Sequence, residues 1–157
     1  MDREIERKFL VKIEEWQPKS KGNLYLQGYL STVKERVVRV RVTGDKGFLT
    51  VKGMTERFSR PEFEYEIPVR DAHQMLDTLC ELPLIEKNRY REEHKGMIWE
   101  IDVFLGDNKG LVLAEVELES ATQQFTLPPW IGEEVSEDPR YFNANLIKNP
   151  FRQWHNC

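Results

Sequence analysis

The sequence predicts a single domain that is mainly antiparallel β-sheet with few helices. Two observations support this prediction: eight short segments have the composition and alternation of strands, and turn residues separate many of them. The expected strands cover residues 4–11, 23–30, 35–43, 46–52, 62–69, 87–93, 97–104 and 111–119. Short strands joined by tight turns are typical of an antiparallel sheet, a sandwich or a barrel.

Turn residues indicate how several of these strands are connected. Gly44-Asp45 separates the third and fourth strands, and Lys95-Gly96 separates the sixth and seventh. A run of Gly, Asp, Asn, Lys and Gly at 106–110 precedes the eighth strand. Because tight turns need residues that tolerate unusual backbone angles, we expect these neighbouring strands to form hairpins.

Helix signals are fewer. Asp71 and Ser120 are suitable N-caps, and Asp138 followed by Pro139 is a typical helix start. The expected helices cover 71–79, 121–125 and 138–148, with a weaker helical turn at 14–16. These helices are too short and too few to form the framework of the domain, so the strands are expected to do so.

Length and composition narrow the class of protein. A chain of 157 residues fits one domain, 1–157, that buries a core without disulfides. A net charge of −4 argues against a nucleic-acid partner, and no apolar run is long enough to span a membrane. The N-terminus lacks a signal-like apolar stretch, and Cys80 and Cys157 form no disulfide framework, so we expect a cytoplasmic protein.

One face of most of the expected strands is charged. Residues two apart in a strand share a face, so Glu4, Glu6 and Lys8 lie opposite Ile5 and Phe9. Six further segments alternate in the same way, and their charged faces carry Arg39 and Arg41; Lys52; Glu62, Glu64 and Glu66; Lys87, Arg89 and Arg91; Glu100 and Asp102; Glu115, Glu117 and Glu119. Acidic and basic residues are sorted by strand, and few Ser, Thr or Gln residues interrupt them.

Two interpretations account for this pattern. An antiparallel sheet often has one face in water, and a charged face is then simply solvated. Alternatively, the sheet closes into a barrel with the charges inside and the apolar residues outside, covered by helices and loop aromatics. We favour the barrel because a solvated face normally mixes charges with neutral polar residues. A barrel of about eight strands has room inside for one small ligand.

A charged lumen indicates a particular chemistry. Crowded carboxylates need cations to offset their repulsion, and Mg²⁺ and Mn²⁺ prefer carboxylate and water oxygens. Lysines and arginines in the same lumen suit a polyphosphate. Arg57 and Arg60 precede Pro61 in a loop, where they either reach a mouth of the barrel or are solvated.

The motifs resemble one family. Glu4-Ile-Glu6-Arg-Lys8 matches the ExExK signature of the CYTH superfamily, the triphosphate tunnel metalloenzymes. The family's further motifs follow in order: Arg39-Val-Arg41, Thr50-Val-Lys52, Glu62-Phe-Glu64-Tyr-Glu66, Lys87-Asn-Arg89-Tyr90, Glu100-Ile-Asp102-Val-Phe104 and Glu115-Val-Glu117. The whole chain is most similar to the short bacterial inorganic triphosphatases, including the tail at 128–141.

The resemblance implies an eight-stranded, closed, tunnel-like barrel of the α+β class with a charged lumen and few flanking helices. It implies two divalent ions, Mg²⁺ or Mn²⁺, bound with the substrate. The implied metal ligands are Glu4, Glu6, Glu62, Glu64, Asp102, Glu115 and Glu117, and the implied catalytic cations are Lys8, Arg39, Arg41, Lys52, Lys87 and Arg89. Lys87 is the candidate general acid or base.

The implied reaction is metal-dependent hydrolysis of inorganic triphosphate to pyrophosphate and phosphate, by a monomer or homodimer. The alternatives are a nucleoside or thiamine triphosphatase or a class IV adenylyl cyclase, and more remotely a non-catalytic polyphosphate-binding module. In the similar inorganic triphosphatases the C-terminal helix can close one end of the tunnel. Here the helix expected at 138–148 either does so, which disfavours nucleotides, or packs on the outer wall.

Overall fold

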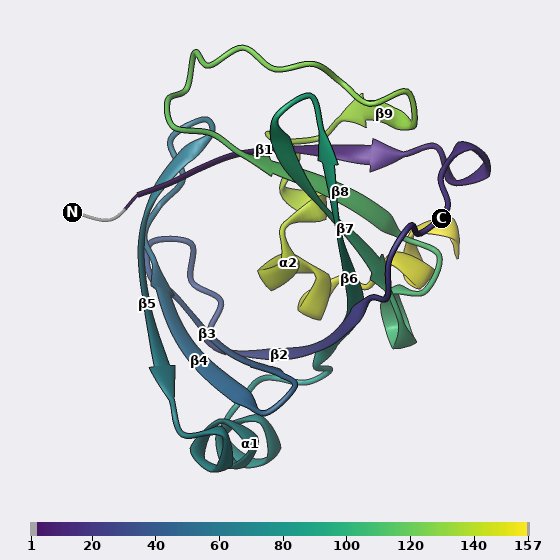
Figure 1. Cartoon of the computed structure of the whole chain (residues 1–157). Helices are drawn as coiled ribbons and strands as arrows, with labels where there is room; N and C mark the ends of the chain where they lie inside the picture. The colour runs from purple at the N-terminus through teal and green to yellow at the C-terminus, as the bar shows by residue number, and fades with distance from the viewer. Residues whose placement is uncertain (1–2, 157) are drawn as a thin grey trace.

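The protein is a closed antiparallel β-barrel with one additional strand (Figure 1). The computed structural model describes residues 3–156, so the predictions that involve Cys157 lie outside the described residues. The strands are β1 (Arg3–Val11), β2 (Asn23–Ser31), β3 (Val37–Thr43), β4 (Lys46–Lys52), β5 (Ser59–Ile67), β6 (Ile85–His94), β7 (Met97–Phe104), β8 (Val112–Glu117) and β9 (Ile131–Glu134). Their order is β5-β4-β3-β2-β6-β7-β8-β1-β9, and a further pairing of β5 with β1 closes eight of them into a ring.

Strand β1 closes the barrel because its free edge is shared by two partners. Its first residues pair with β5, with Glu4 opposite Arg60, and its last residues pair with β9, with Val11 opposite Ile131. The other edge of β1 pairs with β8 along Glu6–Leu10. The predicted eight-stranded closed barrel is therefore confirmed, with β9 as an addition that the sequence did not predict.

The apolar faces of the strands point outward and are covered. Helix α1 (Val69–Thr78) packs its Ala72 and Leu76 against Val40 and Val42 of β3. The approach is close, since a Cβ at Gly47 of β4 would lie 2.7 Å from the Cβ of Ala72. On the wall formed by β1, β7 and β8, aromatic side chains provide the cover. This second cluster includes Phe9, Trp16, Trp99, Phe125 and Trp130.

The C-terminal segment closes part of one end of the barrel. The short helix α2 (Asn143–Lys148) buries Leu146 and Ile147 in a cluster with side chains on the inner face of the strands. The inner-face members of this cluster are Tyr29, Val37, Ile85, Phe104 and Leu113. Figure 1 shows α2 within the ring of strands rather than on its outer wall. The lumen is thus apolar at this end and charged along the rest of its length.

Several predicted boundaries differ from the structure. No helix forms at 121–125; Ala121 and Thr122 form a turn, and Phe125 packs on Phe9 and Trp99 of the outer wall. Helix α1 begins at Val69, because Pro68 is its N-cap and the Pro68 carbonyl accepts a hydrogen bond from the Ala72 amide. Strand β5 accordingly ends at Ile67, before this proline.

The expected helix at 138–148 is interrupted. Asp138 caps a 3₁₀ turn, η3 (Pro139–Tyr141), as its side chain accepts from the Arg140 amide. Phe142 then has an extended backbone, with φ −72° and ψ 129°, before α2 begins. This break turns Phe142 and Asn143 toward the lumen, where both line the central cavity.

The remaining elements are short 3₁₀ helices. They are η1 (Ile13–Glu15), η2 (Gly106–Asn108) and η4 (Phe151–Asn156). The weak helical turn expected at 14–16 corresponds to η1. Within residues 3–156, no helix has the length and apolar character needed to cross a membrane.

Candidate active site

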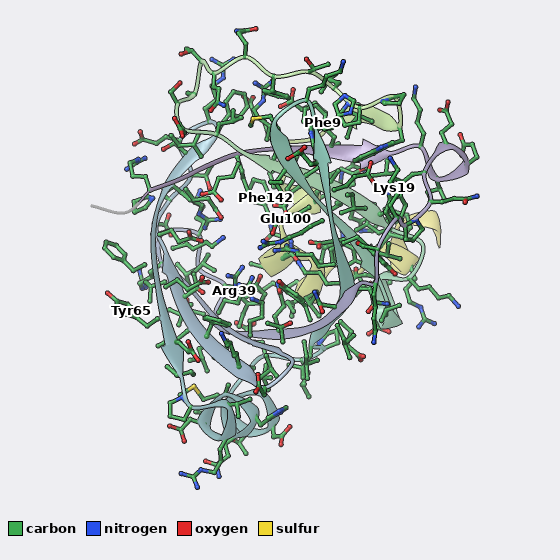
Figure 2. The ribbon with its side chains drawn as sticks, in the orientation of Figure 1. Phe9, Lys19, Arg39, Tyr65, Glu100 and Phe142 are labelled. Atoms are coloured by element: carbon green, nitrogen blue, oxygen red, sulfur yellow. The ribbon has the colours of Figure 1, made fainter. Side chains whose placement is uncertain are left out.

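The lumen of the barrel encloses a cavity of about 500 Å³. All the predicted site residues except Asp102 line it, and they come from β1, β3, β4, β5, β6 and β8. Figure 2 shows Arg39, Glu100 and Phe142 inside the ring of strands and Tyr65 outside it. The alternation of charged and apolar residues therefore assigns the inner face correctly, and the interpretation as a solvated sheet face is wrong.

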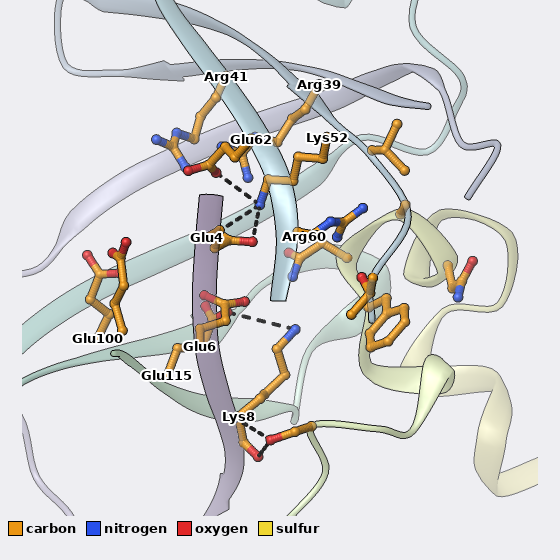
Figure 3. Close-up of a pocket in the computed structure, with 18 of the residues that line it drawn as sticks. Glu4, Glu6, Lys8, Arg39, Arg41, Lys52, Arg60, Glu62, Glu100 and Glu115 are labelled. Carbon is orange, nitrogen blue, oxygen red and sulfur yellow. Dashed lines mark hydrogen bonds and ion pairs between the residues drawn. The ribbon is translucent and has the colours of Figure 1, made fainter. Parts of the chain in front are cut away.

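Lys52 joins the acidic start of β1 to β5. Its ammonium lies 3.0 Å from Glu4 Oε2 and 3.4 Å from Glu62 Oε2, as Figure 3 shows. Burial alone would raise the pKa of Glu4, but the charge of Lys52 and its hydrogen bond outweigh burial and lower it. Glu4 is therefore an ionised carboxylate within the lumen.

Arg39 and Arg41 share one carboxylate. Their Nη2 atoms lie 3.2 Å and 3.4 Å from Glu64 Oε1, which also accepts a hydrogen bond of 2.8 Å from Thr50. Burial, and then repulsion from Arg39 and Arg89, lowers the pKa of Arg41 to about 10. The buried Nε atoms of Arg39 and Arg41 have no hydrogen-bond partner among the described residues. Such a surplus of buried donors and positive charge suits an anion.

Lys87 and Arg89 hold Asp102 beneath the cavity. Arg89 donates to both oxygens of Asp102, at 2.7 Å and 2.9 Å, and Lys87 Nζ lies 2.8 Å from Oδ2. Burial opposes the charge of Asp102, but these two cations hold the pKa of its carboxyl well below the usual range. Lys87 also donates to Asn143 Oδ1 of α2 at 3.0 Å. Burial lowers the pKa of Lys87 to about 8 despite the attraction of Asp102.

The centre of the lumen has an excess of carboxylates. Lys8 Nζ lies 3.9 Å from Glu115 and donates to the Tyr141 carbonyl at 3.1 Å. Glu6 is hydrogen-bonded to Glu115, and burial followed by the charges of Glu115 and Glu4 raises the pKa of Glu6 well above its ordinary value. A proton is therefore more favourable on Glu6 than on an ordinary glutamate, and a bound cation would compete with it.

The donor set at this point fits a hard divalent cation. Glu4, Glu6, Glu115 and Glu117 all present carboxylate oxygens to the cavity, as Mg²⁺ and Mn²⁺ prefer. In the part of the chain that the structure describes, no three acidic, His or Cys side chains already converge in a metal-binding arrangement. The reason is visible in their contacts: Glu4 turns to Lys52, and Glu6 turns to Glu115.

The structure adds lumen residues to the predicted site residues. Tyr25 lies under two guanidinium groups, with Arg41 and Arg89 at 5.0 Å and 4.9 Å from its ring centroid. Thr50 shares the face of Lys52, so its inward orientation follows from alternation alone. Asn143 carries no such signal, because only the packing of α2 brings it to Lys87.

Comparison with known proteins agrees with this geometry. The model of the CYTH domain matches residues 2–149. The chain belongs to the CYTH domain family. An inorganic triphosphatase from Acetivibrio thermocellus is 52% identical over 154 residues, covering 98% of this chain and 99% of that protein. An inorganic triphosphatase from Nitrosomonas europaea is 41% identical over 151 residues, covering 91% and 95%.

Solved structures extend the comparison of this CYTH protein. A crystal structure of an inorganic triphosphatase has a TM-score of 0.65 at 37% identity and covers 94% of this chain and 95% of its own. A protein from Pyrococcus horikoshii has a TM-score of 0.59 at 18% identity, covering 96% and 99%, and supports the fold alone. The predicted family and barrel are confirmed.

Proposed function

We propose that this CYTH protein hydrolyses inorganic triphosphate to pyrophosphate and phosphate, with a divalent metal ion as cofactor. The observation that carries the proposal is the cavity itself, in which cations from β1, β3, β4 and β6 face carboxylates from β1, β5 and β8. A triphosphate chain needs both groups, since its oxygens bind cations and its metal ions bind carboxylates. The two curated relatives are inorganic triphosphatases by name.

The cations of the lumen are assigned to the phosphate chain. Arg39 and Arg41 supply guanidinium donors, including the two buried Nε atoms, and suit bidentate contacts with phosphoryl oxygens. Lys8, Lys52 and Arg89 add charge around the chain and stabilise the negative charge that develops on the leaving group. These contacts also orient the phosphorus atom for in-line attack by water.

The carboxylates are assigned to Mg²⁺ or Mn²⁺. Glu4, Glu6, Glu115 and Glu117 are the proposed ligands. Glu62 and Glu64, which pair with Lys52 and with Arg39 and Arg41, are secondary candidates. Asp102 is the weakest candidate, since Lys87 and Arg89 hold it beneath the cavity. When bound, the metal polarises phosphoryl oxygens and lowers the pKa of a bound water.

Lys87 is the proposed proton carrier. With a pKa of about 8, a fraction of its amine is neutral near neutral pH, so it can accept a proton from the attacking water or return one to the leaving group. The hydrogen bond from Lys87 to Asn143 fixes the amine at the end of the cavity next to α2. This position beside the closed end also favours a compact substrate over a nucleotide.

Product formation tests the proposal. The purified protein is incubated with Mg²⁺ or Mn²⁺ and with inorganic triphosphate, ATP or thiamine triphosphate. We expect chelator-sensitive release of pyrophosphate and phosphate from inorganic triphosphate and little from the other two. Preferred turnover of ATP would indicate a nucleotide enzyme, and cyclic AMP among the products would indicate a cyclase. No turnover of any substrate would contradict the proposal. We also propose that the protein is a cytoplasmic monomer or homodimer.

A further inference from the structure

The cavity opens at two places that differ in charge. Connections β2–β3 and β4–β5 lie at one end of the barrel, and the β6–β7 hairpin lies at the other, because β2 and β6 pair antiparallel with Gln27 opposite Ile85. The first opening lies at the end that α2 partly closes, since α2 packs there against Tyr29 at the end of β2 and Val37 at the start of β3. We call it the basic rim, formed by Lys34, Arg57 and Arg60. The second is the acidic mouth, formed by Glu100, Glu117 and Glu119 with Arg91.

The cations of the basic rim are weakly paired. Lys34 is exposed and has no ion-pair partner among residues 3–156. Arg60 donates to the Gly53 carbonyl at 3.1 Å and contacts no carboxylate in the described part of the chain (Figure 3). Arg57 lies 3.3 Å from Glu137, but both side chains are largely exposed, at 75% and 61%. An exposed ion pair of this kind is easily exchanged for a stronger anion.

Local structure directs Arg57 to the rim. Its backbone has φ +60°, an angle that residues other than glycine rarely adopt. Its guanidinium lies 4.9 Å from the centre of the Phe58 ring, which Arg7 contacts at 4.4 Å. Arg7 in turn binds Glu134 of β9. The loop is thus anchored on β1 and β9, and Arg57 is held at the opening rather than free to leave it.

The acidic mouth has the opposite character. A hollow of about 350 Å³ adjoins the main cavity there and shares Arg91, Glu100 and Glu117 with it. Arg91 pairs with Glu100 at 3.0 Å, which leaves Glu117 and Glu119 without a cation there among the described residues.

From this polarity we infer that the triphosphate anion enters through the basic rim, and that Lys34 and Arg57 capture it before it reaches the catalytic cations. The inference rests on the proposed function. The cations of the rim attract an anion, and oriented charges of this kind accelerate association. Arg57 releases Glu137, binds a phosphoryl oxygen instead, and so directs the triphosphate into the lumen. Glu35 and Glu56, in the same two loops, do not line the cavity.

Charge reversal at the rim tests the inference. Initial rates on inorganic triphosphate are measured at saturating Mg²⁺ over a series of salt concentrations, for wild type, K34E/R57E and the matched control R70E/K109E. Arg70 and Lys109 are exposed and lie away from the cavity, so the control changes net charge equally. For K34E/R57E we expect kcat/KM to fall at least about tenfold at low salt through KM, with kcat within about twofold. The deficit should shrink as salt rises.

A variant that is expected to gain activity controls for misfolding. Glu137→Gln removes the anion that competes for Arg57, so kcat/KM should rise about twofold, which a damaged fold does not produce. The inference is wrong if K34E/R57E retains wild-type kcat/KM, if the control loses as much, or if kcat falls while KM is unchanged. Absence of wild-type turnover would refute the proposed function instead. In that case, calorimetric binding of inorganic triphosphate to K34E/R57E would test the inference, and an affinity equal to that of wild type would refute capture at the basic rim.

Discussion

Replacing Arg41 by methionine should make the protein more stable and less active. Burial and two neighbouring arginines lower the pKa of Arg41 from 12.5 to about 10. At about 1.4 kcal/mol for each pKa unit, the charged side chain is unfavourable in the folded state by roughly 3 kcal/mol. Methionine has a similar length and keeps a contact with the ring of Tyr25. Glu64 loses one partner but retains Arg39 and Thr50.

Loss of the hydrogen bond from Arg41 to Glu64 offsets some of this energy, so we expect a net gain of about 1–3 kcal/mol. For a domain of this size, 2 kcal/mol raises Tm by about 4–8 °C, which calorimetry of the metal-free protein resolves easily. The kcat/KM for inorganic triphosphate should fall at least about tenfold, since the proposed contact of Arg41 with the phosphate chain is lost.

The control is Arg70→Met, which lies on the surface away from the cavity. It should change stability by no more than about 0.5 kcal/mol and leave activity intact. A lower Tm for Arg41→Met would refute the view that the lumen accumulates unfavourable positive charge for a ligand. Unchanged activity would refute the placement of Arg41 on the substrate.

Three further variants test other parts of the lumen. Glu6→Gln mimics the protonated carboxyl. Because the pKa of Glu6 is raised in the folded state, the substitution should stabilise the protein most near pH 8 and progressively less toward pH 4.5, as thermal unfolding would show. Stabilisation of the protein by added metal should be lost in this variant. Arg89→Ala leaves buried Asp102 with Lys87 alone, so urea unfolding should show a loss of about 3–5 kcal/mol, and a loss under 1 kcal/mol would contradict the network. Leu146→Ala in α2 should cost about 2–5 kcal/mol and raise the rate on ATP relative to inorganic triphosphate; an unchanged ratio would argue against closure by α2.

The inner face of the barrel could be predicted from the sequence because it depends on local geometry. Alternation at Glu4, Glu6 and Lys8, and at Arg39 and Arg41, places these side chains on one side of their strands whatever the partner strands are. The same reasoning assigns Val40 and Trp99 to the outer face, where the structure buries them under α1 and the loop aromatics. The acidic and basic composition of the cavity is a direct consequence.

Long-range contacts were beyond this reasoning. Closure by β5 and β1, the addition of β9, and the partners of each cation depend on register, which no single strand specifies. The expected helix at 121–125 was wrong because Phe125 is more stable against Trp99 than in a short, exposed helix. Asn143 reaches Lys87 only because Phe142 interrupts the last helix.

The sequence by itself therefore determined which residues face the lumen, because side-chain alternation is fixed by the geometry of one strand. Only the tertiary structure decided how those charges are shared. It pairs Lys52 with Glu4, raises the pKa of Glu6 through burial and the neighbouring carboxylates, and sets Arg57 at one opening and Glu117 at the other. These outcomes depend on distances between strands and loops far apart in the chain, where burial strengthens each interaction between charges.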